Sequence, residues 1–186
     1  MTVWLLRHAE TEWSRARRHT GRTDLPLTPA GEAAARAVAP RLAEHAFARV
    51  LASPLQRARR TAALAGFPDA ELRDDLMEWD YGEVEGITSA EWRERTGDPG
   101  WRVWTGPVPG GETVQDVGAR ADRVLAEVAG VDGDVLLVAH AHLLRVLTAR
   151  WLGQPPAFGG SLRLEPAALA ALGFEGDARV LLRWGV

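Results

Sequence analysis

Two short apolar runs, each followed at once by a histidine, constrain the fold of this chain most. Residues 3–6 (VWLL) run straight into Arg7 and His8, and residues 134–139 (DVLLVA) run into His140. Runs of this kind, without polar alternation, are typical of strands buried on both faces of a sheet. Open α/β sheets bind ligands beyond the carboxyl ends of their strands. We therefore expect His8 and His140 to lie together at one ligand-binding edge.

A helix is expected after the polar, arginine-rich loop that follows the first run. Thr28 is placed as its N-cap and Pro29 at its first helical position, a combination typical of helix starts. Ala34, Val38 and Leu42 recur every four residues and form an apolar stripe. This stripe predicts a helix that packs against the sheet.

A tight strand–helix unit is predicted next. Residues 49–52 form a short strand candidate, and Ser53 with Pro54 repeats the cap-and-proline signal before a helix over residues 55–65. The N-terminus of such a helix offers unpaired backbone N–H groups to an anion. Thr113 caps the clearest amphipathic helix of the sequence.

This alternation of strands and helices predicts an α/β fold with a mainly parallel central sheet. At this length, one domain covering residues 1–186 is expected. The tail predicts a hairpin from residues 168–174 and 179–184, joined by a turn at 175–177. The hairpin could supply a sheet edge for a homodimer, but the sequence does not decide the oligomeric state.

Composition excludes several classes of chemistry. The chain has no cysteine, which removes disulfides, thiolate catalysis and cysteine-based zinc sites. Its net charge of −3 gives no indication of a nucleic-acid-binding surface. No apolar run is long enough to span a membrane or to serve as a signal peptide. We expect a soluble cytoplasmic protein without a nucleic-acid or membrane partner.

The candidate site has the residues of an anion pocket. Arg57 lies in the first turn of the helix after Ser53, from which its guanidinium could reach the edge that holds Arg7, His8 and His140. Guanidinium groups match phosphate in a bidentate fashion. Without a metal, a histidine nitrogen could attack phosphorus and form a covalent intermediate that water hydrolyses. Nearby positive charge would keep that histidine neutral, as a nucleophile must be.

A leaving alkoxide would still need a proton. Glu78 lies among apolar and aromatic residues, and it is the carboxyl most expected to be desolvated and therefore protonated. It could equally be an ordinary loop acid.

The nearby aromatics Trp79, Tyr81, Trp101 and Trp104 either cover the pocket or serve as packing anchors. Likewise Arg15, Arg17, Arg18 and Arg22 either meet a second anionic group or form a solvated loop.

Six motifs together resemble the histidine phosphatase superfamily (phosphoglycerate mutase-like). They occur in the matching order across roughly residues 3 to 152: RHAETEWS (7–14), TGRTDLPLTPAG (20–31), SPLQRAR (53–59), EWDYGEVEG (78–86), GGET (110–113) and VAHAHLLR (138–145). The resemblance implies a three-layer α/β/α sandwich. It implies that His8 is the phosphorylated nucleophile, that Arg7, Arg57 and His140 form the phosphate pocket, and that Glu78 is the proton donor.

The same resemblance implies which residues line the substrate-binding side of the pocket. Thr11, Ser14, Thr20 and Gly21 match positions that help to line it, and Tyr81 and Ala141 are further substrate-binding candidates. The chain departs from the family pattern at three positions. Ala9 and Ala141 stand where a glycine usually follows each histidine, and Ser14 stands where the mutases usually have asparagine. A methyl group at position 9 or 141 could narrow the approach of backbone to phosphate.

Within the superfamily, the motifs resemble phosphatases of the acid phosphatase and sedoheptulose-bisphosphatase type. The stretch between Glu78 and His140 is compact, whereas the mutases carry a longer insertion there. The resemblance therefore favours a phosphatase for small phosphorylated metabolites, with no metal and no cofactor. A cofactor-dependent phosphoglycerate mutase is the alternative, and a non-catalytic phospho-ligand sensor is a third. The physiological substrate is not determined by the sequence.

Overall fold

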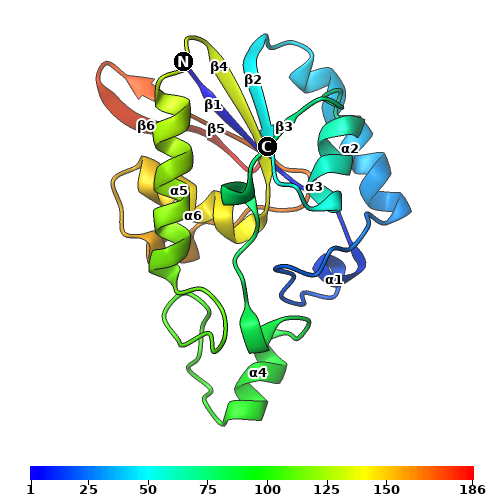
Figure 1. Cartoon of the computed structure of the whole chain (residues 1–186), viewed down its shortest axis with the longest axis vertical. Coiled ribbons are helices and arrows are strands. Elements are labelled where there is room, and N and C mark those ends of the chain that lie inside the picture. Colours follow the sequence, from blue (N-terminus) through cyan, green and yellow to red (C-terminus); the bar gives the residue numbers. More distant parts are fainter.

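One six-stranded sheet lies between two helical layers in the computed structural model, which describes residues 1–186 (Figure 1). The strands and α-helices follow in the order β1 (Val3–Arg7), α1 (Glu12–Arg15), α2 (Pro29–Leu42), β2 (Phe47–Ala52), α3 (Gln56–Leu64), β3 (Glu71–Leu72), α4 (Ser89–Thr96), α5 (Val114–Ala129), β4 (Asp134–Ala139), α6 (Ala141–Trp151), β5 (Leu169–Glu175) and β6 (Ala178–Trp184). Three short 3₁₀ helices complete the list: Asp74–Leu76, Gly82–Val84 and Pro156–Ser161. The predicted α/β/α sandwich is confirmed.

The sheet is mixed, with a parallel half that carries the two histidine-terminated strands. The strand order is β3-β2-β4-β1-β5-β6. The pairs β2/β3, β2/β4 and β1/β4 are parallel, whereas β5 and β6 are added in antiparallel fashion. Arg7 at the end of β1 pairs with Ala139 at the end of β4, and the next backbone bond runs from His8 N to Ala139 O at 2.8 Å. His8 and His140 therefore share one edge, as expected.

Alternate residues of the central strands build two separate cores, which explains why residues 3–6 and 135–139 are all apolar. In β1, Val3 and Leu5 pack into a large core with α5 and α6, whereas Trp4 and Leu6 pack into a smaller core with α2 and α3. All four side chains are buried. A strand with both faces covered by helices has no place for a polar side chain.

Local signals predicted most helix ends correctly, with two corrections. Thr28 caps α2 and Thr113 caps α5, each by accepting a backbone N–H three residues on. In α2 Val38 and Leu42 are buried as predicted, whereas the third residue on the buried face is Ala35 and not Ala34. Ser53 does not cap a helix, because α3 begins later and its N-cap residue, Leu55, has no side-chain oxygen.

The segment between β3 and α5 extends away from the sheet and carries α4 (Figure 1). Trp79 and Trp101 are buried in it, and their indole N–H groups donate to Glu112 O and Pro107 O. These tryptophans are packing anchors that fix the shape of a segment with little regular structure.

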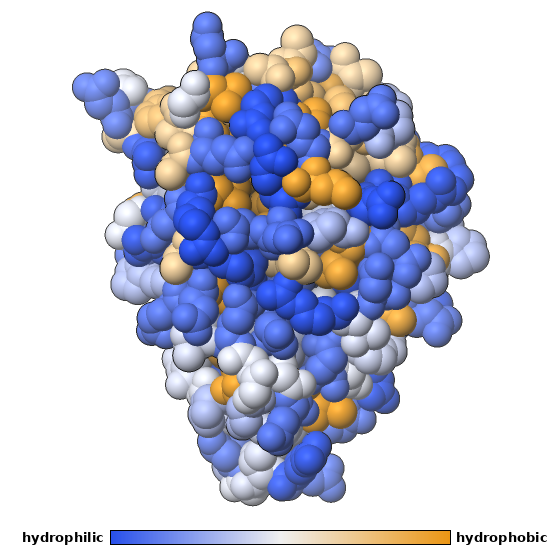
Figure 2. All heavy atoms as spheres, in the orientation of Figure 1, coloured by the Kyte–Doolittle hydropathy of each residue, from blue (hydrophilic) through white to orange (hydrophobic).

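The C-terminal hairpin forms as predicted and leaves β6 at an edge of the sheet, so the homodimer stays a prediction. Polar and charged side chains cover most of the face in Figure 2, and apolar atoms appear there in small separate groups. None of the helices combines the length and the apolar character that crossing a membrane would need.

Candidate active site

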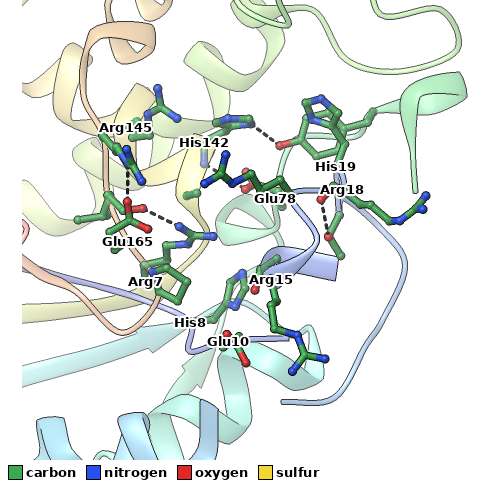
Figure 3. Close-up of a pocket in the computed structure, with 18 of the residues that line it drawn as sticks. Arg7, His8, Glu10, Arg15, Arg18, His19, Glu78, His142, Arg145 and Glu165 are labelled. Carbon is green, nitrogen blue, oxygen red and sulfur yellow. Dashed lines mark hydrogen bonds and ion pairs between the residues drawn. The ribbon is translucent and has the colours of Figure 1, made fainter. Parts of the chain in front are cut away.

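A pocket of about 730 Å³ opens beyond the carboxyl end of β1. Seven of the predicted site residues line it: Arg7, His8, Ser14, Thr20, Glu78, Tyr81 and Ala141. Figure 3 labels Arg7, His8 and Glu78 among them. The other four, Thr11, Gly21, Arg57 and His140, are not among its lining residues. Seven residues predicted from the sequence therefore share one pocket, and the other four lie behind its surface.

His8 is held with one ring nitrogen free toward the pocket. Its Nδ1 lies 2.8 Å from the carbonyl oxygen of Ala9, and a carbonyl can only accept, so Nδ1 carries the hydrogen. In the neutral ring Nε2 then has a lone pair, and it has no partner in the protein. Burial first, and then the charges of Arg57 and Arg7, lower the pKa of His8 well below its usual value. His8 is thus a neutral imidazole with an available lone pair.

Arg7 presents an unoccupied guanidinium edge beside His8. Its Nη1 donates to Leu164 O at 2.6 Å, while neither Nε nor Nη2 has a protein partner. Nε is buried, and a buried donor without a partner is costly unless a ligand satisfies it. The Nε–Nη2 edge is also the edge that binds an anion with two parallel hydrogen bonds.

Arg57 and His140 form a bonded pair behind His8 and contribute nothing to the pocket surface. Arg57 Nε donates to His140 Nδ1 at 3.1 Å, which leaves the hydrogen of this ring on Nε2, facing Ser53 Oγ at 2.8 Å. The rings of His140 and His8 lie 5.1 Å apart. Both nitrogens of His140 are therefore engaged within the protein.

Three of the four remaining guanidinium hydrogens of Arg57 hold a loop in place. Nη1 donates to Thr23 O, and Nη2 donates to Thr20 O and Gly21 O, at 2.9 to 3.0 Å. Four of its five N–H groups are thus used, and Arg57 is completely buried. Direct phosphate contacts by Arg57 and His140 stay predictions, because in this structure their hydrogen bonds run to each other, to Ser53 and to the backbone of residues 20–23.

Protein groups occupy part of the N-terminus of α3, which the sequence had predicted to offer unpaired backbone N–H groups to an anion. Gln56 N, in its first turn, donates to Asp24 Oδ1 at 2.7 Å. Ser53 Oγ accepts from Leu55 N at 3.3 Å and also faces His140. A carboxylate and a hydroxyl of the protein thus occupy two of the backbone donors that were expected to be available to a phosphate.

Glu78 is buried as expected, and backbone donors fix both of its carboxylate oxygens. Oε1 accepts from Trp79 N at 3.0 Å and from Leu143 N at 2.9 Å, whereas Oε2 accepts only from His142 N at 3.0 Å. Two of these donors belong to the first turn of α6. Oε2 keeps the freer lone pair, so it is the oxygen that could carry a proton toward the pocket.

Several predicted substrate-side residues have structural partners. Thr11 and Ser14 form the capping box of α1, which leaves Thr11 completely buried and only Ser14 at the pocket. Gly21 donates to the carboxylate of Glu85, and a Cβ at this position would lie 2.4 Å from Trp79 O. Ala9 is buried with its N–H donating to Thr61 Oγ1, so its methyl group is accommodated in the core.

Residues that the sequence did not predict as site residues also line the pocket. His142 and Arg145 of α6 and His19 line the pocket, and the repeated histidine in residues 140–142 was the only signal for the first of them. Of the four arginines in the segment between β1 and α2, three (Arg15, Arg17 and Arg18) also line the pocket. The fourth, Arg22, instead lies within ion-pair distance of Asp80 and Glu112.

The family of this chain follows from comparison with known proteins. A family model described as the histidine phosphatase superfamily (branch 1) matches residues 3–186. An acid phosphatase of Mycobacterium tuberculosis is 39% identical, over 98% of this chain and 91% of the relative. A sedoheptulose 1,7-bisphosphatase of Saccharomyces cerevisiae is 34% identical over 80% of this chain, and the match spans 66% of its own length.

A relative with another activity in its name also matches. It is a probable phosphoglycerate mutase of Photorhabdus laumondii, 31% identical over 99% of this chain and 90% of the relative. Among solved structures, that of an open reading frame of Mycobacterium tuberculosis superposes with a TM-score of 0.94 at 38% identity. The superposition covers 100% of this chain and 97% of the chain in that structure.

Proposed function

Because the chain belongs to the histidine phosphatase superfamily, we propose that it is a metal-independent phosphatase for phosphomonoesters of small metabolites. The observation that carries this proposal is the state of His8. Its Nδ1 is tied to Ala9 O, so Nε2 can attack phosphorus without first losing a proton. The low pKa of His8 extends this readiness into acid solution, where an ordinary histidine would be protonated.

The first chemical step transfers the phosphoryl group to His8. The Nε2 lone pair forms a bond to phosphorus while the ester P–O bond breaks, and the leaving alkoxide takes a proton from Glu78 Oε2. The free edge of Arg7 binds two non-bridging oxygens and neutralises the charge that they share. The second step hydrolyses the phosphohistidine: the oxygen of a water molecule forms a bond to phosphorus while Glu78 accepts its proton, the N–P bond breaks, and inorganic phosphate leaves.

Trapping the intermediate tests this mechanism. After brief reaction with a ³²P-labelled phosphomonoester and denaturation, the protein is expected to carry a label that is labile to acid and stable to base. His8→Ala should abolish the label, whereas Arg59→Gln, on an exposed part of α3, should keep it. A label that persists in His8→Ala would contradict the assignment of the nucleophile.

A mutase is the second candidate, because relatives with that name match most of the chain. It would require the phosphohistidine to survive until a second substrate oxygen attacks it. Adding 2,3-bisphosphoglycerate and measuring conversion of 3- to 2-phosphoglycerate against release of inorganic phosphate separates the two activities. We expect phosphate release to dominate, because the compact segment between Glu78 and His140 offers little to exclude water.

A further inference from the structure

His142 lines the pocket but takes no part in the two proposed chemical steps. His142 lies in the first turn of α6, and its ring faces the same pocket as His8 and Glu78. Its backbone N–H holds Glu78 Oε2 at 3.0 Å. His142 therefore holds the carboxyl group of Glu78, which donates the proton, through its backbone. Its ring is a second polar group, available to the part of a ligand that lies beside Glu78.

The tautomer of His142 follows from its contact with Tyr81. The Tyr81 hydroxyl lies 2.5 Å from His142 Nδ1 and has no other partner, and Tyr81 is only 2% exposed. A buried phenol hydrogen with one acceptor in reach is donated to that acceptor. Nδ1 thus accepts, and in the neutral ring Nε2 carries the hydrogen. Nε2 itself has no hydrogen-bond partner in the protein.

The ring is neutral and fixed in direction. Burial, followed by the charges of Arg145, His19 and Arg7, lowers the pKa of His142 well below its usual value. The ring packs edge-on against Trp104 with centroids 4.8 Å apart, and Arg145 lies 4.5 Å from the same tryptophan centroid. These contacts make Nε2–H a preorganised, uncharged donor beside a cation.

The position of this donor matches the organic part of a substrate. Glu78 lies between His142 and His8 in Figure 3, and Arg7 is close enough to both histidines to lower the pKa of each. When phosphorus is in line with His8 and the ester oxygen is near Glu78, the rest of the leaving group extends toward His142 and Arg145. Hydrocarbon there would leave Nε2–H without a partner.

We propose that His142 Nε2–H recognises an oxygen atom on the leaving group, so that the site selects phosphomonoesters of polyols and sugars over those of hydrocarbons. This inference rests on the proposed function, because it places the phosphoryl group at His8. Tyr81 acts through His142 as a positioning residue, since its hydroxyl fixes which ring nitrogen bears the hydrogen.

A matched pair of inert ligands tests the inference by binding, without turnover. Isothermal titration compares 2,3-dihydroxypropylphosphonate with propylphosphonate, which differ only in two hydroxyl groups. The wild-type protein should bind the first about ten-fold more tightly, as expected for one additional buried hydrogen bond. The ratio should fall to near one in His142→Leu and recover in His142→Gln, whose amide can place an N–H near the position of Nε2. Tyr81→Phe should give an intermediate ratio.

The possible failures are distinguishable. A ratio that stays near ten in His142→Leu would overturn the role of His142 and leave the phosphatase proposal intact. If the wild-type protein bound both phosphonates equally tightly, the inference about His142 would fail and the phosphatase proposal, which the labelling of His8 tests, would stand. Nitrogen-15 shifts of the His142 ring in the ligand-free protein provide an independent measurement. A hydrogen on Nδ1 instead of Nε2 would overturn the inference whatever the affinities.

Discussion

Arg57 Nε donates to His140 Nδ1 across 3.1 Å, in a place where neither residue is exposed to solvent. The pair joins the first turn of α3 to the end of β4, and through the other nitrogens of Arg57 it also holds the backbone of residues 20–23. These interactions make Arg57 a structural connector at the base of the pocket, whatever its contact with substrate.

Replacing Arg57 should therefore destabilise the fold. Arg57→Gln leaves several buried carbonyl oxygens and His140 Nδ1 without donors, and we expect a loss of about 2–4 kcal/mol in the free energy of unfolding. Arg59→Gln, two residues along the same helix and exposed, should change it by less than about 0.5 kcal/mol. Urea titration followed by circular dichroism measures both.

A double-mutant cycle isolates the pair itself. Arg57→Gln and His140→Gln should be non-additive, with a coupling of about 0.5–3 kcal/mol. Strict additivity would show that the 3.1 Å contact contributes nothing to stability.

Replacing Glu78 should affect substrates according to their leaving groups. Glu78→Gln removes the proton that Oε2 supplies, so kcat/KM for an alkyl phosphate should fall by about 10²–10⁴-fold. An activated aryl phosphate, whose leaving group needs no proton, should lose far less in the phosphorylation step. Release of p-nitrophenol and of inorganic phosphate measures the two reactions. Equal losses on both substrates would contradict the role of proton donor.

Folding should be sensitive to acid because of the buried histidines. Burial and neighbouring arginines lower the pKa of His8, His140 and His142 in the native state, and burial lowers that of His19 to about 4. Below about pH 6.5 the unfolded chain binds protons that the native state does not bind, so the free energy of unfolding falls as pH decreases. It should be insensitive to these groups above about pH 7.5.

The expected slope is about 1.4 kcal/mol per pH unit for each such histidine. Urea titrations between pH 7.5 and 4.5 measure this slope. His19→Gln removes one of the histidines, so between about pH 6 and 4.5 the slope should fall by the contribution of a single histidine. A flat profile down to pH 5 would show that these histidines are protonated as readily in the folded protein as in the unfolded chain.

The sequence by itself determined the sheet, its helical layers and the edge at which His8 and His140 meet. These features depend on local patterns: apolar runs at 3–6 and 134–139, and the threonine caps of α2 and α5. Such patterns act over a few residues, so they can be recognised without knowing what packs against them. The motif resemblance then supplied the roles of Arg7, Arg57, Glu78 and His140, which stay predictions.

Only the tertiary structure decided which atoms face the pocket. Arg57 is turned away by carbonyl groups of residues 20–23, more than thirty positions earlier in the chain. His142 is set by Tyr81, which lies 61 positions away in sequence. A hydrogen bond depends on the direction of each donor and acceptor in space, and chain segments so far apart acquire those directions only when the whole fold has formed.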